Sequence, residues 1–275
     1  MTLLTSEQYE RAKALEGVTL NWRALEYVSE SYKSDREIVV AAVSVGGRAL
    51  QWAAEAFQGD REVVLTAVNQ DGVALQWAAE TCSSDRQVVL AAVQNTGEAL
   101  KWAAEVCRRD CEIVLAAVKA SGLALEWAAQ SCKSDRAIVS AAVSQNGLAL
   151  RWAAEICKSD REIVLAAVQH AGISIRWADE ILRSDREIAL TSVQDDERAF
   201  EYVADELLED DSFAAERKRL FYILKITRLS GEHTFLLVWP HKLEFTEVVL
   251  SRCCQRLKLF YTGRERLVHG SEVVP

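Results

Sequence analysis

Hydrophobic and polar positions repeat every 25 residues along most of the chain. In the first clear unit Ile38, Val39, Ala42 and Val43 fall at i, i+1, i+4 and i+5, which places them on one face of an α-helix. A further apolar residue, Val40, widens this face. We therefore expect a first helix in each unit that is apolar almost all round and is the more buried of two.

The second half of each unit predicts another helix of about ten residues, too short to be stable without stacking. Its inner side carries Leu50, Ala53 and Phe57, and its Trp52 falls at the border of the apolar and polar faces. A glycine separates the two helices, where it favours a left-handed stop. The glycines are Gly47, Gly72, Gly97, Gly122, Gly147 and Gly172.

Each first helix is preceded by an aspartate and, in several units, by a serine before it. The pair Ser159 and Glu162 has the spacing of a capping box, so we expect the serine to be the N-cap. An aspartate at the next position also suits the positive end of a helix. The aspartates are Asp35, Asp60, Asp85, Asp110, Asp135, Asp160, Asp185 and Asp210.

The unbroken period predicts an all-α fold, an α-solenoid of about seven 25-residue helix-turn-helix repeats with degenerate caps at both ends. We expect residues 1–34 to be a lead-in and capping repeat, 35–209 the repeat array, and 210–275 a C-terminal capping helix and tail.

After Asp210 the period is lost. Within this tail, 212–226 and 245–260 predict helices and 235–239 predicts a short apolar strand, whereas the last fifteen residues look irregular.

The net charge of −9 is distributed unevenly. Residues 212–275 have 11 basic and 6 acidic side chains, and the rest of the chain has 21 and 35. An acidic array is a poor match for nucleic acid, so we do not expect a nucleic-acid partner. The longest apolar runs have about six residues, too few for a membrane span.

Four cysteines occupy one position of the repeat: Cys82, Cys107, Cys132 and Cys157. Successive copies would lie roughly 9–10 Å apart, which is a helix-packing distance and too far for a disulfide. They are expected to be small core residues of a protein in a reducing, cytoplasmic compartment. The N-terminus has no apolar stretch of the kind that a secretory signal needs.

The units resemble a repeat family known as domain of unknown function 4116. The family pattern begins with an aspartate followed by hydrophobic pairs, which residues 60–68 match here. It continues with a glycine, matched by Gly72, and with Ala-Leu-x-aromatic-Ala, matched by residues 74–78. The resemblance covers about residues 20–209, with a nearly constant tryptophan where the family often has tyrosine. It implies a helical repeat and no established activity.

Two rows of side chains are the candidate partner-binding residues. The first is Trp52, Trp77, Trp102, Trp127, Trp152 and Trp177, and the second is Glu55, Glu80, Glu105, Glu155 and Glu180. The tryptophans form either a groove for a protein or peptide or a packing layer across the joints between units.

The glutamates either meet a basic partner or pair within their own helix. The pairs expected from helical spacing are Arg151–Glu155, Arg176–Glu180 and Glu155–Lys158. A row of arginines in the first helix is expected to pair with acids of the previous unit. These arginines are Arg36, Arg61, Arg86, Arg136, Arg161 and Arg186.

No phosphate-binding loop, dinucleotide turn or nucleophile elbow occurs in the sequence. We therefore expect no catalytic residues, no cofactor and no metal site. The leading hypothesis is a monomeric, non-enzymatic scaffold that binds an unknown protein or peptide. The alternatives are a nucleic-acid-binding repeat protein, and an array that serves as a mount for an activity or docking signal in residues 211–275.

Overall fold

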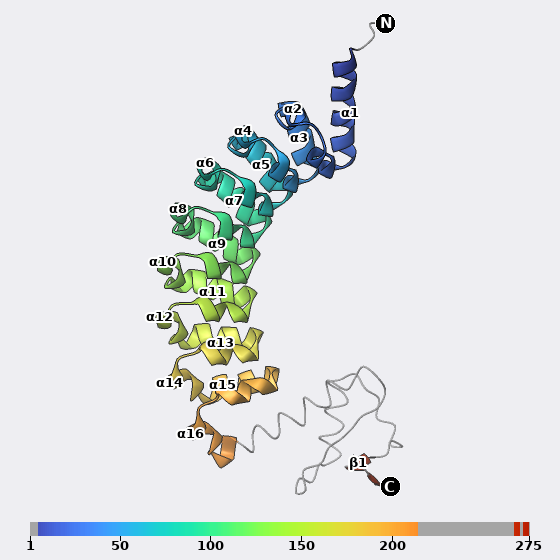
Figure 1. Ribbon diagram of the computed structural model, residues 1–275. Helices are drawn as coiled ribbons and strands as arrows, with labels where there is room; N and C mark the ends of the chain where they lie inside the picture. The colour runs from blue at the N-terminus through green and yellow to red at the C-terminus, as the bar shows by residue number, and fades with distance from the viewer. Residues whose placement is uncertain (1–4, 214–266, 270–271, 275) are drawn as a thin grey trace.

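The computed structural model describes residues 5–213, 267–269 and 272–274 (Figure 1). Within 5–213, similar helical units stack one after another into a curved array. The long helices of consecutive units pack against each other, and so do the 3₁₀-helices that follow them. The predicted all-α solenoid of tandem repeats is confirmed.

Each unit contains three helical elements in sequence. The long α-helices are α3 (Arg36–Val45), α5 (Arg61–Gln70), α7 (Arg86–Asn95), α9 (Cys111–Ala120), α11 (Arg136–Gln145), α13 (Arg161–His170) and α15 (Arg186–Asp195). The 3₁₀-helices are η1 (Trp22–Glu26), η2 (Gly47–Trp52), η3 (Gly72–Trp77), η4 (Gly97–Trp102), η5 (Gly122–Trp127), η6 (Gly147–Trp152), η7 (Gly172–Trp177) and η8 (Glu197–Tyr202). The short α-helices are α2 (Glu30–Lys33), α4 (Glu55–Gln58), α6 (Glu80–Ser83), α8 (Glu105–Arg108), α10 (Gln130–Lys133), α12 (Glu155–Lys158), α14 (Glu180–Arg183) and α16 (Asp205–Leu208).

The second half of each unit is therefore not the single helix that its sequence predicts. Between η2 and α4 the chain is extended at Ala53 and Ala54, with ψ of 149° and 150°. The backbone N–H of Ala54 donates to the carbonyl of Lys33 in the preceding unit, at 3.1 Å. Because this N–H bonds to another unit, the helix is interrupted at Ala54. The prediction that Trp52 and Glu55 lie on one continuous helix is therefore wrong.

The aspartate, and not the serine, caps each long helix. The Asp160 carboxylate accepts hydrogen bonds from the backbone N–H groups of Glu162 and Ile163, at 3.0 and 3.3 Å. Ser159 instead ends the preceding short helix α12. A carboxylate at the N-cap satisfies two free N–H groups and lies at the positive end of the helix.

The glycine of each unit is required by close packing and not by a left-handed turn. Gly122 opens η5, and a Cβ there would lie 2.4 Å from the carbonyl oxygen of Ala142 in the next unit. The residue that ends the long helix, Ser121, has extended backbone angles of φ −149° and ψ 115°. Glycine lets the 3₁₀-helix of one unit approach the long helix of the next.

The core runs along the array between the long helices and the 3₁₀-helices. Each long helix buries the four positions predicted for it, as Ile38, Val39, Ala42 and Val43 do completely in α3. Leu50 of η2 adds to the same core. The first helix of the unit is the more buried one, as predicted.

At the N-terminal end, α1 (Ser6–Leu20) packs against α3. Its Arg11 donates to Asp35 at 2.6 Å, so the lead-in covers the face of the first clear unit. At the other end the repeat pattern continues beyond the position where it was expected to be lost. Phe213 is buried, and Asp210 accepts from its backbone N–H as the other cap residues do. The boundaries of the three expected segments stay predictions.

The last fifteen residues were expected to be irregular, which is wrong for part of them. Strand β1 (Leu267–His269) pairs antiparallel with β2 (Glu272–Val274), with Leu267 opposite Val274. Of the helix expected at 212–226, residues 214–226 lie outside the described part of the chain, as do the helix expected at 245–260 and the apolar run 235–239. Among the described helices, none has the length and apolar character needed to cross a membrane.

Candidate functional site

The tryptophan row lies at the joints between units. Each tryptophan ends a 3₁₀-helix, is half-buried and packs against the core. The first member of the row, Trp52, also contacts Trp22, which begins η1; the two ring centroids are 5.5 Å apart. The structure thus places part of each ring in the packing layer between units and leaves part of it exposed, and a role of the exposed part in binding stays a prediction.

Basic side chains lie over several of these rings. Lys101 is 5.8 Å from the ring centroid of Trp102, and Arg151 is 5.5 Å from that of Trp152. Arg176 lies over two aromatic rings, at 5.2 Å from Trp177 and 5.3 Å from Tyr202. Cation–π contacts of this kind fix both the cation and the ring.

These contacts replace two expected ion pairs. Arg151–Glu155 and Arg176–Glu180 were expected from helical spacing, but the chain is extended between η6 and α12, and between η7 and α14. In the described part of the chain, Glu155 pairs with Lys158 at 2.9 Å, as expected.

The glutamate row opens the short helices. Glu55, Glu80, Glu105, Glu155 and Glu180 are each the first residue of such a helix. All five are exposed. At Glu105, Arg108 and Arg109 both pair with the carboxylate, at 3.0 Å.

A set of exposed aliphatic side chains was missed from the sequence. Val106, Ile156 and Ile181 occupy one repeat position, directly after the glutamates, and are 63%, 72% and 80% exposed. The signal in the sequence was the appearance of large aliphatic residues where other units have alanine, threonine or serine.

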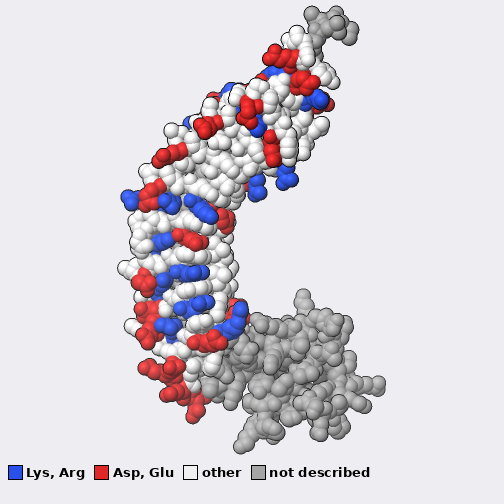
Figure 2. Space-filling view, in the orientation of Figure 1, with Lys and Arg blue, Asp and Glu red and all other residues white. Residues whose placement is uncertain are grey.

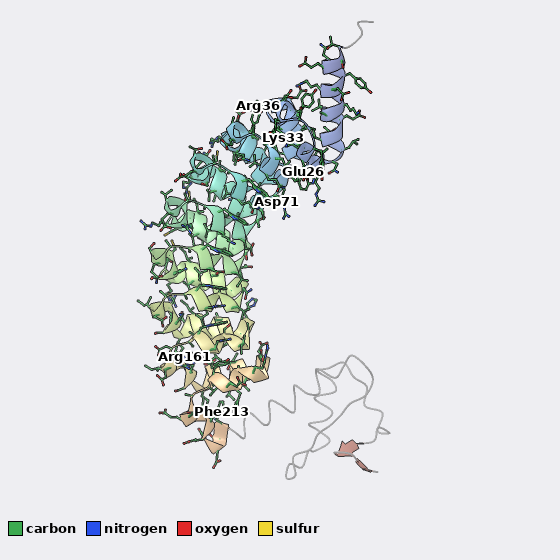
Figure 3. All side chains as sticks on the ribbon, viewed as in Figure 1. Glu26, Lys33, Arg36, Asp71, Arg161 and Phe213 are labelled. Atoms are coloured by element: carbon green, nitrogen blue, oxygen red, sulfur yellow. The ribbon has the colours of Figure 1, made fainter. Side chains whose placement is uncertain are left out.

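The arginine row forms ion pairs with the next unit, not with the previous one. Arg161 donates to Asp185 at 2.8 Å and to Glu187 at 2.5 Å. Figure 3 shows Arg36 and Arg161 near the edge of the array that carries the short helices. The same link joins Arg11 to Asp35, Arg36 to Asp60, Arg61 to Asp85, Arg86 to Asp110, Arg136 to Asp160 and Arg186 to Asp210.

These ion pairs act on the capping carboxylates. The hydrogen bond from Arg136 lowers the pKa of Asp160 below its usual value, although partial burial opposes the shift. The backbone hydrogen bond from Val88 lowers the pKa of Asp85. One aspartate thus caps its own helix and joins the preceding unit. Figure 2 shows the resulting mixture of acidic and basic side chains along the array.

The cysteine row is buried, as expected. The thiols of Cys82, Cys107 and Cys157 contact backbone carbonyls of the preceding unit at 3.4–3.6 Å. Burial raises the pKa of each of these thiols. Over the residues that the structure describes, no group of three or more His, Cys, Asp or Glu side chains could hold a metal ion.

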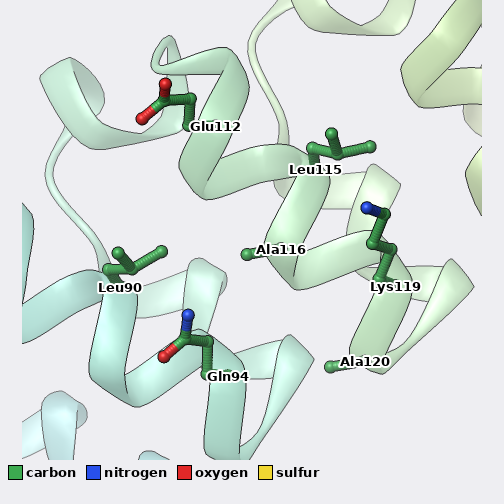
Figure 4. Close-up of a pocket in the computed structure, with 7 residues that line it drawn as sticks. All are labelled: Leu90, Gln94, Glu112, Leu115, Ala116, Lys119 and Ala120. Atoms are coloured by element: carbon green, nitrogen blue, oxygen red, sulfur yellow. The ribbon is translucent and has the colours of Figure 1, made fainter.

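A second surface feature is an open hollow of about 520 Å³ on the long helices α7 and α9. Figure 4 shows how neighbouring helices supply its lining. The lining residues are Leu90, Gln94, Glu112, Leu115, Ala116, Lys119 and Ala120. The hollow has two partly buried leucines at the same repeat position, with polar side chains at its rim.

A comparison with protein-family models finds one match, to a family described as domain of unknown function (DUF4116). The matched segments are 13–58, 60–105, 110–158 and 160–208, so each match covers about two units. Neither curated proteins nor solved structures give a match to this chain.

Proposed function

The chain belongs to the DUF4116 family, and we propose that its repeat array is a protein-binding scaffold. The binding surface is the short-helix edge, defined as the tryptophan row together with the first two residues of each short helix. The short helices lie on the outer side of the curve in Figure 1.

The observation that carries the proposal is the exposure of Val106, Ile156 and Ile181. Exposed large aliphatic side chains at one position of a repeat form a periodic apolar row, and apolar rows rimmed by polar groups are typical of protein interfaces. They are not needed for the core, because their side chains point away from it. Half-exposed Trp152 and Trp177 precede two of them by four residues and would supply the aromatic contacts that dominate many interfaces.

The charges along this edge indicate what kind of surface the partner presents. Glu155 and Glu105 are paired within their own helices, and Arg151 and Arg176 lie over aromatic rings. Mixed, internally paired charges favour a partner that presents apolar side chains with polar groups around them. The arginine row is matched by carboxylates at its joints, which disfavours the nucleic-acid alternative.

The test is affinity capture from the source cell with the wild-type full chain, a variant of the edge and a matched control, followed by Leu115→Ser as a variant of the hollow. Ile156→Ser with Ile181→Ser removes most of the exposed aliphatic row and should leave thermal stability unchanged, because both side chains are already exposed. Recovery of the specific partner should fall at least about tenfold, the loss expected when interface anchors are truncated. Leu20→Ser is the matched control, since Leu20 is 80% exposed on α1, outside the edge.

A partner that is recovered equally with the wild-type chain, the edge variant and the matched control would refute the role of this edge. Loss of capture on Leu115→Ser alone would move the binding surface to the hollow on α7 and α9. Salt-sensitive recovery of nucleic acid with the wild-type chain would favour the nucleic-acid alternative.

A further inference from the structure

One joint of the array lacks the arginine link. Cys111 stands at the position where the units on either side have Arg86 and Arg136. The acceptor that follows the capping aspartate is missing as well, because Ala137 replaces the glutamate found at Glu162. Both halves of one ion pair are therefore changed at the same joint.

Two thiols meet at this joint. The Sγ atoms of Cys111 and Cys132 are 3.9 Å apart. Cys111 is the first residue of α9 and is exposed, whereas Cys132 is in α10 and is buried. In the other units the row cysteine has no second cysteine at the arginine position, so this pair is particular to one joint.

We propose that Cys111 and Cys132 are an oxidation site, at which a hydroperoxide converts the two thiols into an intramolecular disulfide. The bond would join the start of α9 to α10, the short helix that precedes α11, at a joint where other units have an arginine–aspartate link. Closing the gap from 3.9 Å to the S–S bond length of about 2.05 Å requires side-chain rotation and a small adjustment of the joint.

The reaction balances in two steps. Cys111 gives up its thiol proton as its sulfur attacks the terminal oxygen of the hydroperoxide and the O–O bond breaks. The alkoxide takes that proton and leaves as an alcohol, or as water when the oxidant is hydrogen peroxide, while Cys111 becomes a sulfenic acid. The Cys132 sulfur then attacks the Cys111 sulfur, an S–S bond forms, the S–O bond breaks, and water leaves with the Cys132 proton. Two thiols are oxidised and one hydroperoxide is reduced to an alcohol and water.

The surroundings assign the order of the two thiols. Cys111 is exposed, so a dissolved hydroperoxide reaches it directly. Burial, together with the hydrogen bond to Cys111, raises the pKa of Cys132 to about 11, so that Cys132 is held as the neutral thiol. Its contacts are the carbonyl oxygens of Arg108 and Arg109 and the Cys111 sulfur. Cys111 is therefore the thiol that reacts first, and Cys132 resolves it.

The test treats the full-length, reduced protein with hydrogen peroxide, blocks remaining thiols with N-ethylmaleimide and maps tryptic peptides by mass spectrometry. Cleavage at Arg109, Lys119 and Lys133 puts the two cysteines in neighbouring peptides. The expected product is these two peptides linked with the loss of two hydrogens, formed while Cys107 still carries the blocking group. Dithiothreitol should reverse the link.

Cys111→Ser and Cys132→Ser should each abolish the linked peptide, and Cys107→Ser should leave it intact. Oxidation should raise the melting temperature of the wild-type chain and leave that of Cys111→Ser unchanged. Circular dichroism establishes that each variant is folded. Oxidation of Cys111 to sulfinic acid without a link, or linkage of Cys111 to Cys253 or Cys254 in preference to Cys132, would overturn the proposal.

Discussion

Replacing Gly122 by alanine tests the packing that holds the units together. A Cβ at this position would lie 2.4 Å from the carbonyl oxygen of Ala142 and 3.0 Å from the backbone nitrogen of Asn146. Ordinary contacts of a Cβ begin near 3.4 Å, so the 3₁₀-helix and the next long helix must separate by about 1 Å. Both atoms belong to the backbone, so no side chain can rotate away to relieve the contact.

Two costs contribute to the expected loss. Overpacking of a close-packed interior typically costs about 1–3 kcal/mol. The carbonyl of Ala142 also accepts the N–H of Asn146 at 2.9 Å, and weakening that hydrogen bond adds about 1 kcal/mol. We therefore expect Gly122→Ala to lower the free energy of unfolding by about 2–4 kcal/mol, although alanine is the better helix former.

The assay is urea unfolding followed by far-ultraviolet circular dichroism, with Gly59→Ala as the matched control. At Gly59 the nearest atom to an added Cβ is the Cβ of Ala79 at 3.7 Å, an ordinary contact. This variant should be neutral or stabilised by up to about 1 kcal/mol, because alanine restricts the unfolded chain. Equal unfolding midpoints for the two variants would refute the close-approach explanation of the glycine row.

Three further predictions concern the aspartate caps and the arginine links. Asp160→Ala should cost about 1–2 kcal/mol because it removes an N-cap, whereas Ser159→Ala should change the unfolding midpoint little; the reverse ranking in urea titrations would restore serine as the cap. Arg136→Ala should lower the unfolding midpoint less than Asp160→Ala does because the side chain is 60% exposed and solvent screens its ion pair, and a loss that does not shrink in high salt would contradict this. The pKa values of Asp85 and Asp160 are lowered in the fold, so their stabilising effect is present above about pH 4, the ordinary pKa range of aspartate, and is lost as the pH falls further; thermal melts between pH 6 and pH 2 measure this, and a melting temperature independent of pH would contradict it.

The period and the apolar pattern were enough to predict the stacked helical array. The core includes Ile38, Val39, Ala42 and Val43, because these residues form one apolar face of a ten-residue helix and that face packs against its own unit and the neighbouring units. Such local patterns are contained within one unit. The predicted all-α fold class and the predicted buried face of the first helix were therefore correct.

The errors concern contacts between units, which a pattern within one unit does not contain. The N–H of Ala54 bonds to Lys33 one unit earlier, and this bond divides the expected second helix. Gly122 is required because the carbonyl oxygen of Ala142, one unit later, leaves no room for a Cβ. The direction of the arginine link also depends on how one unit is placed on the next.

The candidate binding residues were found in part. The tryptophan and glutamate rows follow directly from the period, and their roles in binding stay predictions. Ile156 and Ile181 were overlooked because their repeat position varies between units and holds a large aliphatic residue in only some of them. Cys111 was overlooked because it lies outside the repeated cysteine position, at the arginine position of the repeat; the simultaneous change at Ala137 was the available signal.

Hydrogen exchange of the full chain with and without its captured partner tests the central claim most directly. The claim predicts slower exchange of backbone amides in α8, α12 and α14 and at the tryptophans that precede them, with unchanged exchange in α7 and α9 around the hollow. Protection confined to α7 and α9, or no protection in any short helix of a saturated complex, would contradict the assignment of the short-helix edge as the binding surface.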